Sequence, residues 1–412
     1  MNLYLFKEAI GVSSAYGIGS YIKELTHALE GADINIFIVH IFSERPKFEI
    51  ETSNRVENWY VPKGPHDNSS SDTLQKIDYY CKNVAYLLRL YIKDTTDLVF
   101  HFNFNLCFAL AKELKAVYTC KTVITVHYTN WHLMLNGHLS LFQKIKEKTK
   151  EQRNSFEQDI YLCGEKEKSL FLEVDRVIAL SHYMLGVLEN EYGLDKSRIS
   201  VIPNGLDDAF PQSPVNKDVL LKKWNFSNKE SLLLFAGRID HVKGIIYLIS
   251  AFRHVLSAYP NCRLIIAGNG DYDACIKEMT DTCAKITFTG FLEKKDLQEL
   301  YYIANVGVVP SLHEPFGYVA LEMMMFGLPV VATATSGLNE VVDDACGFKV
   351  PIMEFPDHLE IDTMLLSEKI LFLLQHPIEA RQSGQYARKR YKEFYSRDVY
   401  CNNMLNFYQS LY

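Results

Sequence analysis

Short apolar runs alternate along the chain with longer segments whose apolar residues follow a helical period. Each run is followed by roughly 10 to 20 residues of that helical pattern, an order typical of parallel strands buried on both faces. This repetition predicts an α/β protein with a doubly wound sheet in each half of the chain. The runs are NIFIVHIF, DLVFHF, TVITVH and DRVIALS in the first half, and SLLLFAGR, CRLIIAGNG, KITFTGF, VGVVPS and GLPVVAT in the second.

The two halves meet at VIPNGLDDAFPQSP, residues 201–214, where three prolines and an Asn-Gly pair interrupt strand and helix. A chain of 412 residues is long for a single core, so we expect two domains with a hinge at this point. The first domain would span residues 1–205 and the second residues 206–393. The aromatic-rich segment 394–412 is predicted to form a helix that packs back on the first domain.

Composition places the protein in the ordinary globular class. The chain has 48% hydrophobic and 23% charged residues and a net charge of -7, which excludes a disordered or fibrous protein and gives no global field to attract nucleic acid. Nine cysteines without a Cys-x-x-Cys pair favour reduced thiols over disulfides or a zinc site. There is no signal-peptide pattern and no window of about 18 uninterrupted apolar residues. We therefore expect a cytoplasmic protein, with peripheral contact at the inner face of the membrane left open.

Residues 128–172 have a weaker pattern. The segment is helical in propensity and carries several basic residues between Lys144 and Arg153. One interpretation is a solvated pair of helices that covers the sheet, and the other is a surface for a lipid-linked or polymeric acceptor. Residues 67–72, DNSSSD, are predicted to form a loop.

The stretch HEPFGYVALE, residues 313–322, holds the first candidate chemistry. Pro315 and Gly317 end the preceding strand, and the residues after them are predicted to form a helix. The first backbone N–H groups of a helix have no partner within it, so with the helix dipole they attract an anion such as a diphosphate. Glu314 lies just outside this end and Glu322 about one turn inside it. Their carboxylates can accept hydrogen bonds from hydroxyl groups on either side of the diphosphate.

Two cations come earlier in the sequence. In AGRIDHVKG, Arg238 follows a strand and Lys243 comes five residues later, just before the next helix. At the carboxyl end of a strand both could neutralise the same diphosphate, Arg238 as a fork and Lys243 as a point charge. Alone, they are equally well explained as solvated loop residues. The functional interpretation therefore depends on the two glutamates.

These motifs, in this order, resemble family 4 of the retaining glycosyltransferases. The resemblance rests on VIPNGLD, AGRIDHVKG, IIAGNGD and the long stretch from FTGFLEKKD to GLPVVAT. It covers almost the whole second domain and is looser in the first. It implies the GT-B fold, which consists of two facing Rossmann-like, doubly wound domains with an interdomain cleft.

The resemblance also implies roles for individual residues of the second domain. Arg238 and Lys243 would hold the donor diphosphate, Glu322 the ribose hydroxyl groups, and Glu314 the transferred sugar. Backbone contacts to the donor phosphate or sugar are implied for Phe316, Gly317 and Tyr318, and contacts to the nucleobase for the backbone near Phe291 and Leu292.

In the first domain, SSAYGIGSYIKEL resembles the glycine-rich N-terminal loop of the family. Gly17 and Gly19 would let the backbone approach the donor phosphates, although Ser14 and Tyr16 stand where glycine is more usual. A tight turn before a helix is the alternative reason for these glycines. His127, at the end of TVITVH, matches a histidine that points at the transferred sugar in the family. A hydrogen-bonded core histidine is the alternative there.

The implied activity is retaining transfer of a hexose-type sugar from a UDP- or GDP-linked donor to a glycan or lipid-linked acceptor, in the synthesis of surface polysaccharide or glycoconjugate. We expect no metal and no other cofactor, because no Asp-x-Asp cluster lies in a suitable loop. The pairs Asp207-Asp208 and Asp343-Asp344 are predicted to be loop and cap residues. No residue stands out as a covalent nucleophile, which favours front-face attack over double displacement through Glu314. The alternatives are a non-catalytic nucleotide-sugar-binding or interaction protein and a sugar-nucleotide 2-epimerase.

Overall fold

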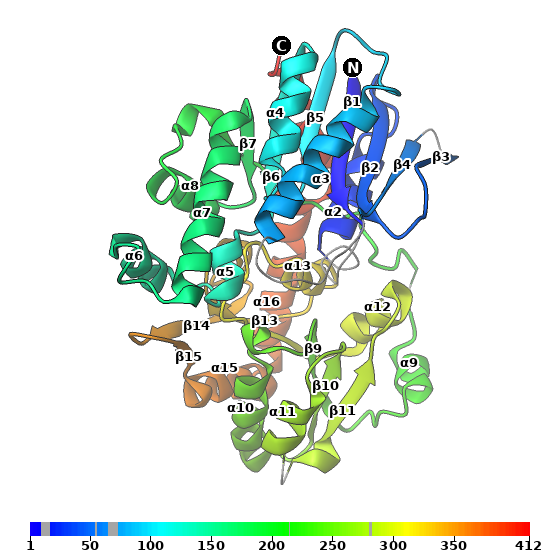
Figure 1. Cartoon of the computed structure of the whole chain (residues 1–412). Helices are drawn as coiled ribbons and strands as arrows, with labels where there is room; N and C mark the ends of the chain where they lie inside the picture. The colour runs from blue at the N-terminus through cyan, green and yellow to red at the C-terminus, as the bar shows by residue number, and fades with distance from the viewer. Residues whose placement is uncertain (10–16, 54–55, 65–72, 214, 280–281) are drawn as a thin grey trace. The chain divides into compact units, whose positions relative to one another are not determined.

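The computed structural model describes residues 1–9, 17–53, 56–64, 73–213, 215–279 and 282–412 (Figure 1). The chain divides by its contacts into two compact units. Unit 1 consists of residues 1–135, 139–204 and 400–412, and unit 2 of residues 136–138 and 205–399. The predicted glycine-rich stretch SSAYGIGSYIKEL is residues 13–25, of which residues 13–16 lie outside the described residues. The predicted DNSSSD loop, residues 67–72, lies wholly outside them.

Unit 1 is built on an eight-stranded sheet with the order β3-β4-β2-β1-β5-β6-β7-β8. Its neighbouring strands are parallel except for β3 and β4. The strands are β1 (Asn2–Glu8), β2 (Asn35–Ser43), β3 (Glu49–Ser53), β4 (Val56–Pro62), β5 (Leu98–Phe102), β6 (Cys120–Val126), β7 (Arg176–Ala179) and β8 (Ile199–Val201). The helices are α2 (Ile18–Ala28), α3 (Thr73–Leu88), α4 (Phe108–Val117), α5 (Asn130–Met134), α6 (Leu139–Glu147), α7 (Ser155–Glu173), α8 (His182–Asn190) and α17 (Arg397–Gln409).

Both faces of this sheet are covered. Along β1, Leu3 and Leu5 enter one core, whereas Tyr4 and Phe6 enter the other, because successive side chains of a strand point to opposite faces. The first of these cores also contains apolar residues from α2 and from the end of the chain. The residues contributed by the end of the chain are Tyr400, Met404, Phe407, Tyr408 and Leu411.

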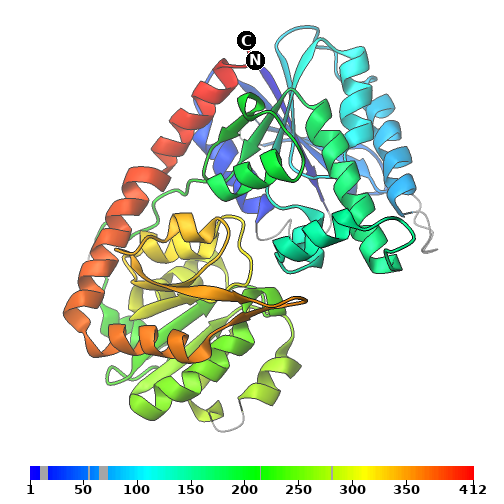
Figure 2. The ribbon, with the colours of Figure 1, turned by 90° about the vertical axis from the view of Figure 1, so that its left-hand side faces the viewer.

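Unit 2 is built on a seven-stranded sheet with the order β11-β10-β9-β12-β13-β14-β15, parallel except for β14 and β15. Figure 2 shows α13 on one side of this sheet and α10 and α15 on the other. The strands are β9 (Ser231–Ala236), β10 (Cys262–Ala267), β11 (Ile286–Gly290), β12 (Val306–Val309), β13 (Val330–Ala334), β14 (Gly347–Glu354) and β15 (Leu359–Ile361). The helices are α9 (Lys217–Lys223), α10 (Ile245–Ala258), α11 (Tyr272–Glu278), α12 (Lys294–Ile303), α13 (Tyr318–Met325), α14 (Leu338–Val341), α15 (Thr363–Gln375) and α16 (Pro377–Arg390).

The predicted pair of doubly wound, mostly parallel sheets is confirmed. Each apolar run named from the sequence contains or overlaps one of the strands above. The segment that was ambiguous in the sequence forms α5, α6 and α7. Its basic residues are largely engaged within unit 1: Lys146 pairs with Glu191 at 2.9 Å and Lys148 with Glu157 at 2.5 Å.

Candidate active site

The strand order of unit 2 reverses between β9 and β12. From β9 the sheet continues through β10 and β11 on one side, and through β12, β13 and β14 on the other. Open α/β sheets bind ligands at such a switch point, beyond the carboxyl ends of the strands. The chain leaves β9 toward Arg238 and Lys243, and it leaves β12 toward Glu314. The predicted charged residues therefore lie on the two sides of this point.

The turn after β9 is held close to the end of β12. Asp240 Oδ1 accepts a hydrogen bond from the Lys243 backbone N–H at 2.9 Å and closes a short 3₁₀ turn. Gly244 follows with a φ of 66°, and a Cβ added there would lie 1.8 Å from the Pro310 carbonyl oxygen. No other residue type fits that approach without a backbone shift. The glycine therefore fixes how near Lys243 comes to the loop that carries Glu314.

Lys243 and Glu314 are in direct contact. Lys243 Nζ lies 2.5 Å from Glu314 Oε2, and the two side chains are 22% and 16% exposed. Arg238 lies nearer the solvent, 44% exposed, and pairs with Asp240 at 3.0 Å. The two predicted phosphate-binding cations are therefore each paired with a carboxylate. An entering diphosphate would have to compete with both of these ion pairs.

The start of α13 has the predicted form. Gly317 precedes the helix with a φ of 103° and no side-chain cap, and Phe316 beside it is buried. A Cβ on Gly317 would lie 3.0 Å from Leu338 Cδ1. The left-handed backbone therefore favours glycine here, and a larger residue would also need the Leu338 side chain to shift by a few tenths of an ångström. The first-turn amides of α13, beginning with Tyr318, point away from the helix body, as at every helix start.

Glu322 lies in the second turn of α13 and is held by a residue that the sequence did not indicate. Tyr301 of α12 donates a hydrogen bond from its hydroxyl to Glu322 Oε2 at 2.8 Å. The Tyr301 side chain is buried, and burial together with the Glu322 carboxylate raises its pKa well above the usual value. The tyrosine therefore remains a hydrogen-bond donor and holds the Glu322 carboxylate in place.

Phe291 and Leu292 follow directly after β11. Parallel strands end at one edge of a sheet, so this turn lies on the same edge as the charged residues. The Phe291 side chain is 55% exposed, whereas Leu292 is half-buried. An exposed aromatic ring at this edge is compatible with the predicted position of the nucleobase.

His313, Thr335 and Ser336 form a polar layer beneath Glu314. His313 is buried, and its Nδ1 lies 2.7 Å from Ser336 Oγ. Burial, with a smaller contribution from Lys243, lowers the pKa of His313 to about 3, so the imidazole is neutral. Thr335 Oγ1 donates to the Leu312 carbonyl at 2.8 Å. The sequence analysis did not single out Thr335 or Ser336, because hydroxyl residues after a strand carry no specific signal.

The remaining predicted site residues belong to unit 1. His127 follows β6, and its Nε2 lies 3.0 Å from Asn103 Oδ1, while its ring meets Tyr21 edge-on with centroids 4.5 Å apart. Desolvation lowers the pKa of His127 to about 3, so this ring too is neutral. Gly17 precedes α2 with a φ of -92°, and a Cβ there would meet nothing within 4 Å. Gly19 lies inside α2.

Gly17 and Gly19 have backbone conformations that other residue types also adopt. Neither Gly17 nor Gly19 is among the glycines with positive φ, and Gly19 is helical instead of part of a loop. Their predicted contact with a donor stays a prediction.

A buried carboxylate organises the loops after β5 and β6. Glu167 of α7 has no exposed surface, and its Oε1 accepts hydrogen bonds from Asn105 Nδ2 at 3.0 Å and from the Asn130 backbone N–H at 2.7 Å. Its Oε2 accepts from the Tyr192 hydroxyl at 2.6 Å. Asn105 Nδ2 also donates to the Tyr128 carbonyl. Glu167 therefore ties the loop after β5 to the loop after β6, which begins with His127.

We expect Glu167 to make stability fall as pH rises. Burial raises its pKa from 4.5 to about 7. Between those values the folded protein binds more protons than the unfolded chain, so stability is lost through that window, by up to about 3 kcal/mol. Glu167→Gln should lose this contribution, giving urea midpoints that change less between pH 5 and pH 7.5. Glu165→Gln, at an exposed position of the same helix, serves as control, and equal pH dependence in all three proteins would contradict the prediction.

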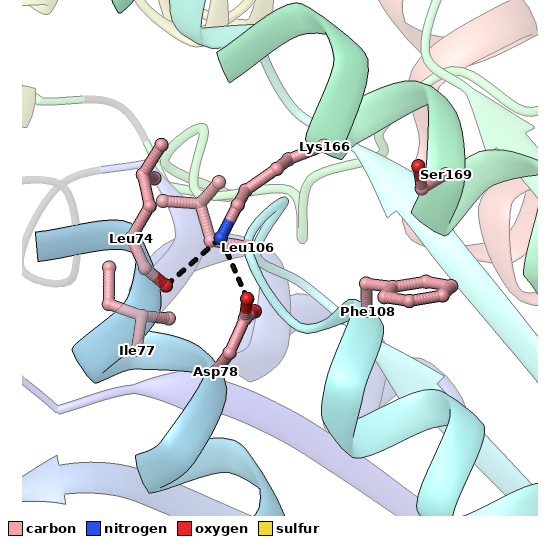
Figure 3. Close-up of a pocket in the computed structure, with 7 residues that line it drawn as sticks. All are labelled: Leu74, Ile77, Asp78, Leu106, Phe108, Lys166 and Ser169. Carbon is pink, nitrogen blue, oxygen red and sulfur yellow. Dashed lines mark hydrogen bonds and ion pairs between the residues drawn. The ribbon is translucent and has the colours of Figure 1, made fainter. Parts of the chain in front are cut away.

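Unit 1 also contains a cavity of about 240 Å³ between α3, α4 and α7 (Figure 3). Lys166 Nζ reaches across it to Asp78 Oδ2 at 2.8 Å and to the Leu74 carbonyl at 3.0 Å. None of the predicted site residues lines it. The lining residues are Leu74, Ile77, Asp78, Leu106, Phe108, Lys166 and Ser169.

The paired aspartates act as predicted in loops and caps. Asp208 forms a double hydrogen bond with Arg388, at 2.8 and 2.6 Å. Asp343 Oδ1 accepts from the Cys346 backbone N–H at 3.1 Å. Among the described residues, no group of three or more His, Cys, Asp and Glu side chains is arranged to hold a metal ion. None of the described helices combines the length and the apolar character needed to span a membrane.

Comparison with known proteins matches both halves of the chain to glycosyltransferase families. Residues 15–210 match the model described as Glycosyltransferase Family 4, and residues 216–390 match the model described as Glycosyl transferases group 1. A glycosyltransferase of Methanocaldococcus jannaschii is 34% identical over 179 residues, which span 40% of this chain and 44% of that relative. The aligned part of this chain thus spans less than half of that relative's length.

A second relative and a solved structure extend the likeness to most of the chain. Mannosylfructose-phosphate synthase of Agrobacterium fabrum is 28% identical over 354 residues, covering 81% of this chain and 74% of the relative. Sucrose-phosphate synthase of Thermosynechococcus elongatus has the same fold, with a TM-score of 0.78 at 23% identity, over 100% of this chain and 98% of that one. Together with the two family models, these matches show that the chain belongs to the group 1, family 4 glycosyltransferases and has the GT-B fold.

Proposed function

We propose that the protein moves a hexose-type sugar from a nucleoside-diphosphate donor, UDP- or GDP-linked, to a glycan or lipid-linked acceptor, with retention of the anomeric configuration and without a metal ion. The proposal adds to the family assignment a class of donor and retention at the anomeric carbon. The reaction would contribute to the synthesis of surface polysaccharide or glycoconjugate.

One observation carries the proposal. At the switch point of unit 2, Lys243, Arg238 and the start of α13 gather positive charge and N–H donors, and Glu314 lies within 2.5 Å of Lys243. This arrangement suits a diphosphate attached to a hydroxyl-rich group, because cations and amides bind the phosphates while the carboxylate accepts from hydroxyls. Glu322, held by the Tyr301 hydroxyl, would accept hydrogen bonds from the ribose hydroxyl groups.

The same groups would promote cleavage of the donor. When the bond between the sugar C1 and the diphosphate oxygen breaks, the electron pair stays on the oxygen, and Lys243 and Arg238 stabilise the new negative charge. The acceptor hydroxyl attacks C1 from the same face, and its proton passes to the departing diphosphate. Glu314 would stabilise the positive charge that develops on the sugar ring. A covalent sugar on Glu314, trapped during turnover, would instead establish double displacement.

The test is a panel of nucleotides, donors and acceptors. Thermal unfolding is measured with UDP, GDP, ADP and CMP, since a ligand at 100 times its Kd adds about 2.7 kcal/mol of stability. Release of nucleoside diphosphate is then measured from UDP-glucose, UDP-N-acetylglucosamine, GDP-mannose and ADP-glucose. Because two of the proteins above are named as synthases of sugar phosphates, sugar phosphates join glycans and lipid-linked sugars as acceptors. Nucleotide binding without turnover would favour a non-catalytic protein, and a new sugar nucleotide formed without acceptor would favour a 2-epimerase.

Glu322→Ala is expected to weaken binding of the nucleoside diphosphate by about ten- to a hundredfold, because a charged hydrogen bond to the ribose is lost. Binding of the intact nucleotide-sugar donor should be weakened equally, since the donor and the nucleoside diphosphate both contain the ribose. Isothermal titration of the panel's best diphosphate measures the effect. Glu368→Ala, at an exposed position of α15, should bind like the unsubstituted protein. Unchanged affinity in Glu322→Ala would remove the ribose assignment.

A further inference from the structure

Ser336 has a backbone conformation that its residue type does not favour. It lies in the short loop between β13 and α14 with a φ of 43°. In this left-handed region a side chain crowds the backbone, whereas glycine adopts it freely. Strain of this kind persists where surrounding structure imposes it, and it gathers at functional sites. The loop keeps a serine although glycine would be the easier residue.

At this strained position, the hydroxyl group of Ser336 makes contacts that glycine could not make. Its Oγ lies 2.7 Å from His313 Nδ1 and 3.1 Å from Thr335 Oγ1, and it accepts a hydrogen bond from the Glu314 backbone N–H at 3.4 Å. One hydroxyl group thus contacts two neighbouring residues of the loop after β12, His313 and Glu314.

The tautomer of the neutral His313 ring sets the direction of the shortest of these bonds. The imidazole is buried beside Lys243 and is neutral. Thr335 Oγ1 gives its proton to the Leu312 carbonyl, so Ser336 Oγ donates to Thr335 Oγ1. Ser336 Oγ then accepts from His313 Nδ1, when the neutral ring carries its proton there, and from the Glu314 amide.

The same loop holds Glu314 from its other side. The Leu338 N–H donates to the Glu314 carbonyl at 3.2 Å, and the Leu312 N–H donates to the Val242 carbonyl at 2.8 Å, next to Lys243. The backbone on both sides of the carboxylate is therefore fixed, on one side by the loop after β13 and on the other by the turn after β9.

We infer that Ser336 is a positioning residue, whose hydroxyl sets the backbone and hence the carboxylate of Glu314 relative to Lys243. The inference rests on the proposed function, in which Glu314 faces the transferred sugar. Small displacements of a catalytic group cost rate far more than they cost binding. The strained φ is then the consequence of placing a hydroxyl where the chain's geometry prefers glycine.

The experiment separates the hydroxyl from the strain. Ser336→Gly removes both, and Ser336→Ala removes the hydroxyl while retaining the strain. The donor identified by the panel above is used to measure kcat and KM for diphosphate release, with the Kd of the matching nucleoside diphosphate and the Tm of each protein. Asn225→Gly is the matched control, because Asn225 is an exposed non-glycine residue of unit 2 with a φ of 56°.

We expect kcat to fall by about 10- to 100-fold in both Ser336 variants, with diphosphate affinity within about threefold of the unsubstituted protein because Lys243 and Glu322 are retained. The Tm should be kept or raised in Ser336→Gly and lowered in Ser336→Ala. Asn225→Gly should have the kcat and KM of the unsubstituted protein, and its Tm should be unchanged or higher.

An unchanged kcat in Ser336→Gly overturns the inference. So does a joint fall of Tm, affinity and kcat in that variant, since this would mark a purely structural residue. If the unsubstituted protein binds a nucleotide but releases diphosphate from no donor, the proposed function fails first, and the inference falls with it.

Discussion

Alanine in place of Lys243 is expected to slow donor cleavage by about two to three orders of magnitude, the usual effect of removing one group that stabilises charge in a transition state. Lys243 is 22% exposed and held at the end of β12 by the Gly244 turn. Solvent therefore screens the charge of Lys243 only weakly, and the turn keeps this charge near the proposed diphosphate site. Because the charge on the departing diphosphate grows as the bond breaks, the loss should appear mainly in kcat and less in KM.

Single-turnover release of nucleoside diphosphate measures this effect without interference from product release. Lys223→Ala is the matched control, because Lys223 also forms ion pairs in unit 2, with Glu299 at 2.6 Å and Asp296 at 3.1 Å, away from the switch point. Its kinetics should not change. An unchanged kcat with a raised KM in Lys243→Ala would show that the lysine binds the donor and transition state equally well.

The positions of three charged residues of the candidate site could be predicted from sequence, because each lies in a loop that follows a strand. Arg238 and Lys243 follow β9, and Glu314 follows β12. Strand runs are visible as apolar clusters, and parallel topology brings the ends of such runs to one edge. The structure adds the reversal of strand order between β9 and β12. No local pattern in the chain reports which strands are neighbours.

The supporting residues could not be predicted in the same way. Tyr301 of α12 contacts Glu322 of α13, and Ser336 in the loop after β13 contacts His313 and Glu314 in the loop after β12. These contacts depend on tertiary packing, and a tyrosine in a helix or a serine after a strand carries no pattern of its own. The strained φ of Ser336 is visible only in the folded chain.

Some elements of the fold were missed for a related reason. β4, VENWYVP, and β14, GFKVPIME, mix polar and apolar residues instead of forming continuous apolar runs. Each pairs with an antiparallel strand near the edge of its sheet, β3 in one case and β15 in the other. Strands near an edge are less completely buried, so the pattern that reveals central strands is weaker there.

Glutamine in place of Glu314 is expected to act in opposite directions on binding and on turnover. Without ligand, the Glu314 carboxylate lies 2.5 Å from Lys243 Nζ, so a nucleoside diphosphate must draw the lysine away from a competing anion. Ion pairs that are partly exposed contribute on the order of 1 kcal/mol. Removing the charge should therefore tighten binding of the diphosphate by about three- to tenfold.

Turnover should nevertheless fall by about two to three orders of magnitude in Glu314→Gln, because a neutral amide stabilises the positive charge developing on the sugar less well than a carboxylate. Titration with the panel's best nucleoside diphosphate and single-turnover cleavage of its donor measure the two effects. Glu299→Gln is the matched control, since Glu299 pairs with Lys223 at 2.6 Å outside the site, and it should change neither. Weaker diphosphate binding in Glu314→Gln would mean that the carboxylate orients Lys243 instead of competing for it. A rate near that of the unsubstituted protein would mean that Glu314 does not face the reacting sugar. Tighter diphosphate binding together with slower donor cleavage would show that the Glu314 carboxylate has two roles. It competes with the product diphosphate for Lys243, and it promotes the cleavage that releases that diphosphate.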